Sequence, residues 1–127
     1  MIATLLKHYK VKVRVVYKPI KDYAYYLLGK GVLQISNKKG VIRDEKEFII
    51  TILHEVWHAV QATKMGWKKL RDEYEMEISK WQLENPKDMA GWMRNKREAI
   101  SFESDAEKYA QKNWKQWHSK FKKQNLI

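Results

Sequence analysis

The chain has no cysteine among its 127 residues. This absence excludes disulfide bonds and cysteine-ligated zinc sites, so histidine and carboxylate side chains are the strong metal ligands that remain. It does not distinguish an oxidising compartment from a reducing one, because the chain offers no thiol that either compartment could change.

Long hydrophobic runs are also absent. The apolar N-terminal segment is interrupted by Lys7 and His8 before it reaches the length of a signal-peptide core, and no later run approaches a membrane span. We therefore expect a soluble, cytoplasmic protein. Internal repeats and low-complexity segments are lacking, and 127 residues are enough for one core but not for two. We expect a single domain over residues 1–127.

Acidic residues are few relative to basic ones. The 26 lysines and arginines outnumber the 15 aspartates and glutamates, which gives a formal charge of +11. An excess of this size favours contact with nucleic acid, an anionic membrane or an acidic substrate. The simpler interpretation is a solvated surface that keeps the protein soluble, so the charge alone does not assign a partner.

The chain does contain the pattern His-Glu-x-x-His, inside the apolar run of residues 49–61. On a helix, His54 and His58 lie one turn apart and about 40° from each other, so both can bind one metal ion. Glu55 lies beside them and can act on a water bound to that metal. The motif therefore predicts a metal site with its own general base.

The surrounding residues predict a helix over residues 44–65, with Asp44 as its N-cap and Gly66 as a stop signal. Apolar side chains cover most of its circumference, which is typical of a helix buried at the centre of a domain. Its polar residues form one stripe: Thr51, His54, Glu55, His58 and Gln61. Unpaired polar groups are costly in a buried position, and a metal ion would supply a partner. The alternative is a coincidence in which both histidines are hydrogen-bonded core residues.

A catalytic zinc usually has three protein ligands and a water, so a third ligand is needed. The downstream candidates are Glu98, Glu103, Asp105, Glu107 and His118. If the C-terminal residues form a helix, Glu103 lies in the middle of its apolar stripe, whereas Glu98 and Asp105 fall about 140° and 160° away. We predict Glu103 as the third ligand, although a lone glutamate beside such a stripe is often a surface residue. Glu107, one turn later, is well placed to accept a hydrogen bond from a ligand histidine.

These residues resemble the gluzincin zinc metallopeptidases, and especially the small soluble minigluzincins related to the catalytic domains of membrane metallopeptidases. The resemblance rests on residues 54–58 (HEVWH) and 102–110 (FESDAEKYA). The second family motif reads roughly Glu-x-x-Ala-Asp-x-aromatic-Ala, with its first glutamate on zinc. The resemblance implies that His54, His58 and Glu103 bind zinc and that Glu55 is the catalytic base. The family's supporting aspartate corresponds to Glu107 here, and residues 66–95 match nothing.

The resemblance implies an α+β, zincin-like fold. Its small, twisted and mostly antiparallel sheet of about three strands packs on the central active-site helix, and a C-terminal glutamate helix follows. The residue patterns predict a similar order on their own: a helix over 1–9, a strand over 11–17, a hairpin from 22–28 and 32–36, the central helix, a charged helix over 72–84, and a last helix that begins between 95 and 101.

By analogy with the family, Val32–Ser36 is the expected edge strand of the cleft. An extended substrate would then add to this strand along its residues Val32, Leu33, Gln34 and Ile35.

The expected function is therefore that of a zinc-dependent peptidase with one catalytic zinc ion and a peptide or protein substrate. Two imidazoles and a carboxylate suit zinc best but also suit iron or cobalt. The donor that stabilises the developing oxyanion stays open among Tyr74, Tyr109 and His118.

A second hypothesis is a basic zinc-containing protein associated with nucleic acid, in which the metal is structural or the protease acts on DNA-bound proteins. Residues 112–123 interleave aromatic side chains with lysines, and such segments can stack bases while the lysines follow phosphates. However, Trp114, Trp117 and Phe121 share the helix stripe of Glu103, so packing against the core is the simpler account. A helix on a membrane surface fits the same residues and is the least favoured of the three hypotheses.

Overall fold

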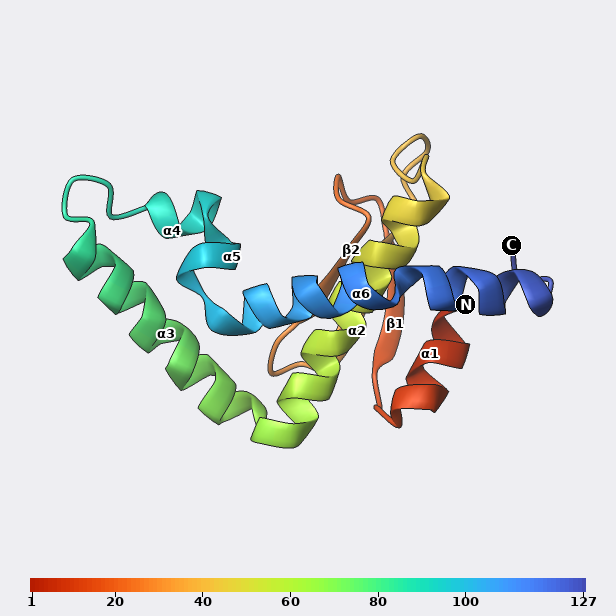
Figure 1. Cartoon of the computed structure of the whole chain (residues 1–127), viewed down its shortest axis with the longest axis horizontal. Coiled ribbons are helices and arrows are strands. Elements are labelled where there is room, and N and C mark those ends of the chain that lie inside the picture. Colours follow the sequence, from red (N-terminus) through yellow and green to blue (C-terminus); the bar gives the residue numbers. More distant parts are fainter.

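The computed structural model describes the backbone of residues 1–127 and every side chain except that of residue 97 (Figure 1). The elements follow in the order α1 (Ile2–Tyr9), β1 (Arg14–Lys18), β2 (Ala24–Leu27), β3 (Val32–Ser36), α2 (Glu45–Met65), α3 (Trp67–Glu84), α4 (Gly91–Arg94), α5 (Lys96–Ala99) and α6 (Ser101–Lys123). The expected α+β class is confirmed. Within the described residues, no helix is both long and apolar enough to cross a membrane.

The sheet has three strands in the order β1-β3-β2. β2 and β3 form the predicted antiparallel hairpin, whose tight connection uses positive φ at Gly29 and Gly31. β1 pairs with β3 in parallel, with Arg14 opposite Val32 and Lys18 opposite Ser36. The expectation of a mostly antiparallel sheet is therefore wrong. The chain reverses twice between β1 and β3, so β3 runs in the direction of β1, and it lies between β1 and β2.

This strand order also corrects the predicted substrate strand. β3 is the central strand, and both of its edges pair with neighbours, so Val32, Leu33, Gln34 and Ile35 have no free edge to offer a peptide. Its apolar side chains are buried, as is typical of an interior strand. The edge strand that faces the central helix is β2, which contacts α2.

The core is built around α2, which α6 crosses (Figure 1). The predicted N-cap is confirmed, because the Asp44 carboxylate accepts from the Glu47 amide at 3.0 Å. Gly66, with a φ of 82°, ends α2, and α3 begins directly after it, five residues earlier than the charged segment predicted at 72. The buried core draws on α1, the sheet, α2 and α6, with members Leu5, Leu33, Ile35, Ile49, Ile52, Leu53, Val56, Trp117 and Phe121.

α3 leads away from this core and returns to it through α4 and α5 (Figure 1). Leu70 is fully buried and holds the first turns of α3 in place. The Glu77 carboxylate of α3 accepts a hydrogen bond of 2.9 Å from the Ser101 amide at the start of α6. A carboxylate at this end of a helix satisfies a free amide and complements the helix dipole. This contact fixes the turn of α6 that carries Glu103.

Candidate metal centre

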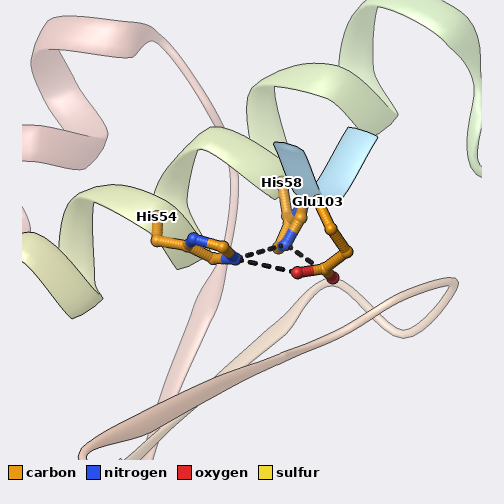
Figure 2. Close-up of side chains that lie close together, drawn as sticks. All are labelled: His54, His58 and Glu103. Atoms are coloured by element: carbon orange, nitrogen blue, oxygen red, sulfur yellow. Dashed lines mark hydrogen bonds and ion pairs between the residues drawn. The ribbon is translucent and has the colours of Figure 1, made fainter. Parts of the chain in front are cut away.

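Three polar side chains converge where the first turn of α6 meets the middle of α2 (Figure 2). The Nε2 atoms of His54 and His58 lie 3.0 Å apart. One carboxylate oxygen of Glu103 lies 3.1 Å from Nε2 of His54, and the other lies 3.1 Å from Nε2 of His58. The residues predicted as metal ligands from two distant parts of the chain are thus brought together.

The outer nitrogen of each imidazole has its own acceptor. His54 Nδ1 lies 2.9 Å from Glu107 Oε2, the contact predicted for that glutamate. His58 Nδ1 lies 2.8 Å from Gln61 Oε1. Because both partners are acceptors, Nδ1 carries the proton in each neutral ring, and the lone pair is on Nε2.

Two Nε2 lone pairs and a carboxylate therefore point at one spot, and such groups repel one another unless a cation lies between them. In a tetrahedral site with bonds of about 2.0–2.1 Å, neighbouring ligand atoms are about 3.3 Å apart. The separations of 3.0–3.1 Å at this cluster are close to that value. The group His54, His58 and Glu103 can therefore hold a metal ion.

The electrostatics of the cluster favour a positive charge at the same spot. Burial alone would lower the pKa of His54, but the hydrogen bond and charge of Glu103, together with the charge of Glu55, raise it above the ordinary value. Burial alone would raise the pKa of Glu103, but its bonds to His54 and His58 hold the pKa far below the usual range. A bound proton supplies one positive charge at this spot, whereas a divalent metal ion supplies two.

Glu55 is held next to the cluster by the edge strand. The Tyr26 amide of β2 donates to Glu55 Oε2 at 2.8 Å. Burial raises the pKa of Glu55, and the charges of His58 and His54 oppose that rise. The glutamate predicted as general base therefore has a fixed orientation and an environment that strengthens it as a base.

Gln61 and Asp105 support the site in a way that the sequence analysis missed. The Gln61 side-chain amide accepts from His58 and donates to the Phe102 carbonyl at 3.0 Å and to Asp105 Oδ2 at 2.9 Å. Trp57 Nε1 donates to the same Asp105 oxygen at 2.8 Å. Gln61 lies three residues after His58 on one helix face, which is the signal that could have identified it. Asp105 is exposed, as predicted, yet it joins α6 to α2.

Cavities reach the cluster from two sides. One, of about 620 Å³, is lined by His54, Glu55 and Glu107 and by β2 residues that include Ala24. The other, of about 220 Å³, is lined by His58 and Glu103 and by the mainly apolar set Tyr26, Leu28, Leu70, Tyr74 and Phe102. The Glu103 side chain keeps 22% of its surface exposed. The cluster is therefore an accessible site at the wall of a cleft.

The three residues considered as oxyanion donors lie in different places. Tyr109 stacks on Trp57 at 3.7 Å, and its hydroxyl bonds to that of Tyr9. His118 pairs with Glu45 at 3.2 Å. Only Tyr74 lines a cavity together with metal-ligand candidates among the described side chains.

The aromatic residues of the basic C-terminal segment mostly pack inward. Trp117 is 4% exposed and Phe121 is 1% exposed, so neither presents a face on which a base could stack. Trp114 is half-buried and packs against the core, and the Lys46 ammonium lies 4.8 Å from its ring centre. The core-packing interpretation of these residues is confirmed, and base stacking on Trp117 and Phe121 is excluded.

Comparisons of the chain with protein-family models, with curated proteins and with solved structures find no match. The assignment of the site therefore rests on its own residues and their geometry.

Proposed function

We propose that the protein is a zinc-dependent metallopeptidase with a zincin-like packing of its helices, similar to the gluzincins. The observation that carries the proposal is the convergence of His54, His58 and Glu103 beside the buried carboxylate of Glu55. Two imidazoles and one carboxylate are a donor set that zinc favours.

The openness of the site supports a catalytic role over a structural one. Structural zinc sites are closed by four protein ligands, whereas catalytic sites have three and keep a position for water or substrate. Here the group of potential ligands consists of three residues among the described side chains, and cavities reach it from both sides.

When bound, zinc lowers the pKa of water and polarises a carbonyl group. Glu55 accepts a proton from the water while the water oxygen forms a bond to the scissile carbonyl carbon. Glu55 then passes that proton to the amide nitrogen as the carbon–nitrogen bond breaks. Glu107 and Gln61 keep the protons of His54 and His58 on Nδ1, which leaves both Nε2 atoms free to bind metal.

The edge strand β2 offers a place for an extended peptide. The Ser36 amide donates to the Tyr23 carbonyl, so Tyr23 faces β3. Because backbone groups alternate along a strand, Ala24 and Tyr26 face away from β3. The Tyr26 amide is bonded to Glu55, and Ala24 lines the larger cavity. We propose that a substrate lies in the larger cavity along the outer edge of β2, which places its backbone beside the general base.

Tyr74 is the proposed donor to the developing oxyanion. Its ring is held between Phe102 and Trp92, at centroid distances of 5.5 Å and 5.8 Å. Burial and the charge of Glu103 raise the pKa of Tyr74, so its hydroxyl keeps its proton and can donate.

The replacement Glu55→Gln tests the general base. We expect the variant to bind one equivalent of zinc and to lose at least about 1,000-fold in kcat on an unfolded protein substrate, because the amide cannot accept the proton. Metal analysis and a casein-type assay measure the two effects. Glu47→Gln is the matched control, because Glu47 lines the same cavity on the same helix. Equal activity of the two variants would refute the role of Glu55.

The replacement Tyr74→Phe tests the oxyanion donor. We expect kcat to fall on the order of 100-fold with little change in KM or zinc affinity, because one donor to the transition state is lost. Tyr109→Phe is the control, since that hydroxyl is bonded to Tyr9. A larger loss of kcat in the Tyr109 variant would reassign the donor.

A further inference from the structure

The net positive charge of the protein comes from the two ends of the chain. Residues 1–21 and 108–127 contain 12 of the 26 basic residues and none of the 15 acidic ones, which leaves 14 basic and 15 acidic residues in 22–107. The segment that carries the metal cluster is therefore nearly neutral. The whole excess of +11 comes from segments that are far apart in sequence.

The fold brings parts of these two segments together. α1 and the C-terminal part of α6 lie at the same end of the molecule (Figure 1). Trp117 Nε1 of α6 donates to the Tyr9 hydroxyl of α1 at 3.1 Å, and the His8 ring meets the Trp117 ring edge-to-face at 4.9 Å. Two basic segments without carboxylate side chains thus share one junction, where their charges add.

A cavity of about 510 Å³ lies at this junction, lined by Thr4, Lys7, His8, Trp117, Lys120 and Gln124. We call these six residues the α1–α6 seam. Lys7 on one wall and Lys120 on the other are both exposed. Lys123 is exposed as well and lies one turn after Lys120, within about 60° of it around the helix. No acidic side chain lines the seam.

We propose that the α1–α6 seam binds the sugar-phosphate backbone of a nucleic acid without reading its sequence. A groove with cations on both walls complements a linear polyanion, and such binding is driven by counterion release from the phosphates. Base reading is not part of the proposal, because Trp117 and Phe121 are buried and offer no stacking face.

Two other kinds of partner fit the seam less well. A helix that lies in a membrane surface inserts apolar side chains, but Leu5, Trp117 and Phe121 belong to the core. A protein interface has a core that is depleted in charge, whereas two of the six residues that line this cavity, Lys7 and Lys120, are lysines on opposite walls. Leu126 and Ile127 are exposed beyond α6, so anionic vesicles are the necessary comparison.

The seam is separate from the metal centre. Lys120 follows Glu103 by 17 residues on α6, which corresponds to about 25 Å along the helix. The inference therefore goes beyond the proposed peptidase activity and does not depend on it. A binding measurement tests it without any reference to hydrolysis.

The full chain is titrated into a fluorescently labelled DNA duplex and, separately, into a labelled single strand. Fluorescence anisotropy measures binding from about 50 to about 200 mM salt. The seam variant replaces the two seam lysines and the neighbouring Lys123 (Lys7→Gln, Lys120→Gln, Lys123→Gln). It is compared with the control Lys68→Gln, Lys69→Gln, Lys87→Gln, which loses the same charge from exposed positions in the nearly neutral segment. We expect the seam variant to lose tenfold or more in affinity at about 50 mM salt, and its salt slope to fall in magnitude by about 2 on the single strand and by about 3 on the duplex. The control should stay within about threefold of the native protein.

Three results would overturn the proposal. The first is no DNA binding by the native protein at about 50 mM salt. The second is an equal loss in the seam and control variants, which would mean that net charge acts without a site. The third is tighter binding to phosphatidylserine vesicles than to DNA, lost in the seam variant, which would assign the surface to a membrane. Thermal unfolding of both variants verifies that they are folded.

Discussion

The two halves of α6 present the same helix face to different surroundings. Glu103 and Phe121 are 18 residues apart, which is five turns, so their side chains leave the helix in nearly the same direction. In the first half that direction leads to His54 and His58 and a site that solvent reaches. In the second half it leads to the apolar core, where Phe121 is 1% exposed.

The difference comes from what lies opposite each half. α6 crosses α2, so its first turns meet the polar stripe of that helix, and its later turns meet α1 (Figure 1). A carboxylate is stable on the inward face only where partners compensate for its burial, and the two imidazoles do so for Glu103. Helical periodicity thus selects the inward face, and the opposing helix determines which chemistry that face can hold.

The largest effect is expected for Glu103, in the first half of α6. Glu103→Ala should weaken zinc binding on the order of 1,000-fold, about 4 kcal/mol, because a charged ligand is lost. Competition with a zinc-binding dye measures the affinity. Glu98→Ala is the control, since Glu98 is an exposed glutamate just before α6. An unchanged affinity in the Glu103 variant would move the third ligand elsewhere.

In the second half of α6, Trp117→Ala should lower the free energy of unfolding by about 3 to 4 kcal/mol, because a large buried side chain is replaced by a cavity. Denaturant unfolding measures the change, and Trp117→Phe should lose less. Leu83→Ala, at a side chain that is 83% exposed, should change stability by no more than about 0.5 kcal/mol. If the Trp117 variants stay folded but fail to bind zinc, the two halves of α6 are not independent.

The smallest effect is expected at Glu107, one turn after Glu103. Glu107→Gln keeps an oxygen that can accept from His54 Nδ1 but removes the charge, so zinc affinity should fall about tenfold. The same dye competition measures the loss, and Glu98→Gln, which removes one exposed carboxylate outside the cluster, is the control. A loss as large as that of Glu103→Ala would mean that Glu107 itself binds the metal.

Several features of the site were predictable because they depend on local geometry. A spacing of four places His54 and His58 on one face of a helix wherever that helix lies. The cap at Asp44 and the stop at Gly66 follow from backbone chemistry within a few residues. The choice of Glu103 over Glu98 and Asp105 needed only the phase of one apolar stripe, and the structure brings Glu103 to the histidines.

Other features depend on contacts between distant elements, and no periodicity encodes them. The pattern of Val32–Ser36 indicates a strand but not its neighbours, so its central position between β1 and β2 was missed. The bond from the Tyr26 amide to Glu55 and the link from His58 through Gln61 to Asp105 exist only because β2 and α6 pack on α2.

The sequence by itself therefore determined the central helix α2, its polar stripe and the side chains able to bind a metal, since helix spacing places these residues whatever surrounds them. Only the tertiary structure decided which strand forms the edge, what orients the two histidines, and that two basic segments from opposite ends of the chain meet at one seam. The physical reason is that strand order and helix crossing are set by packing of the whole core, which is a property of many residues together.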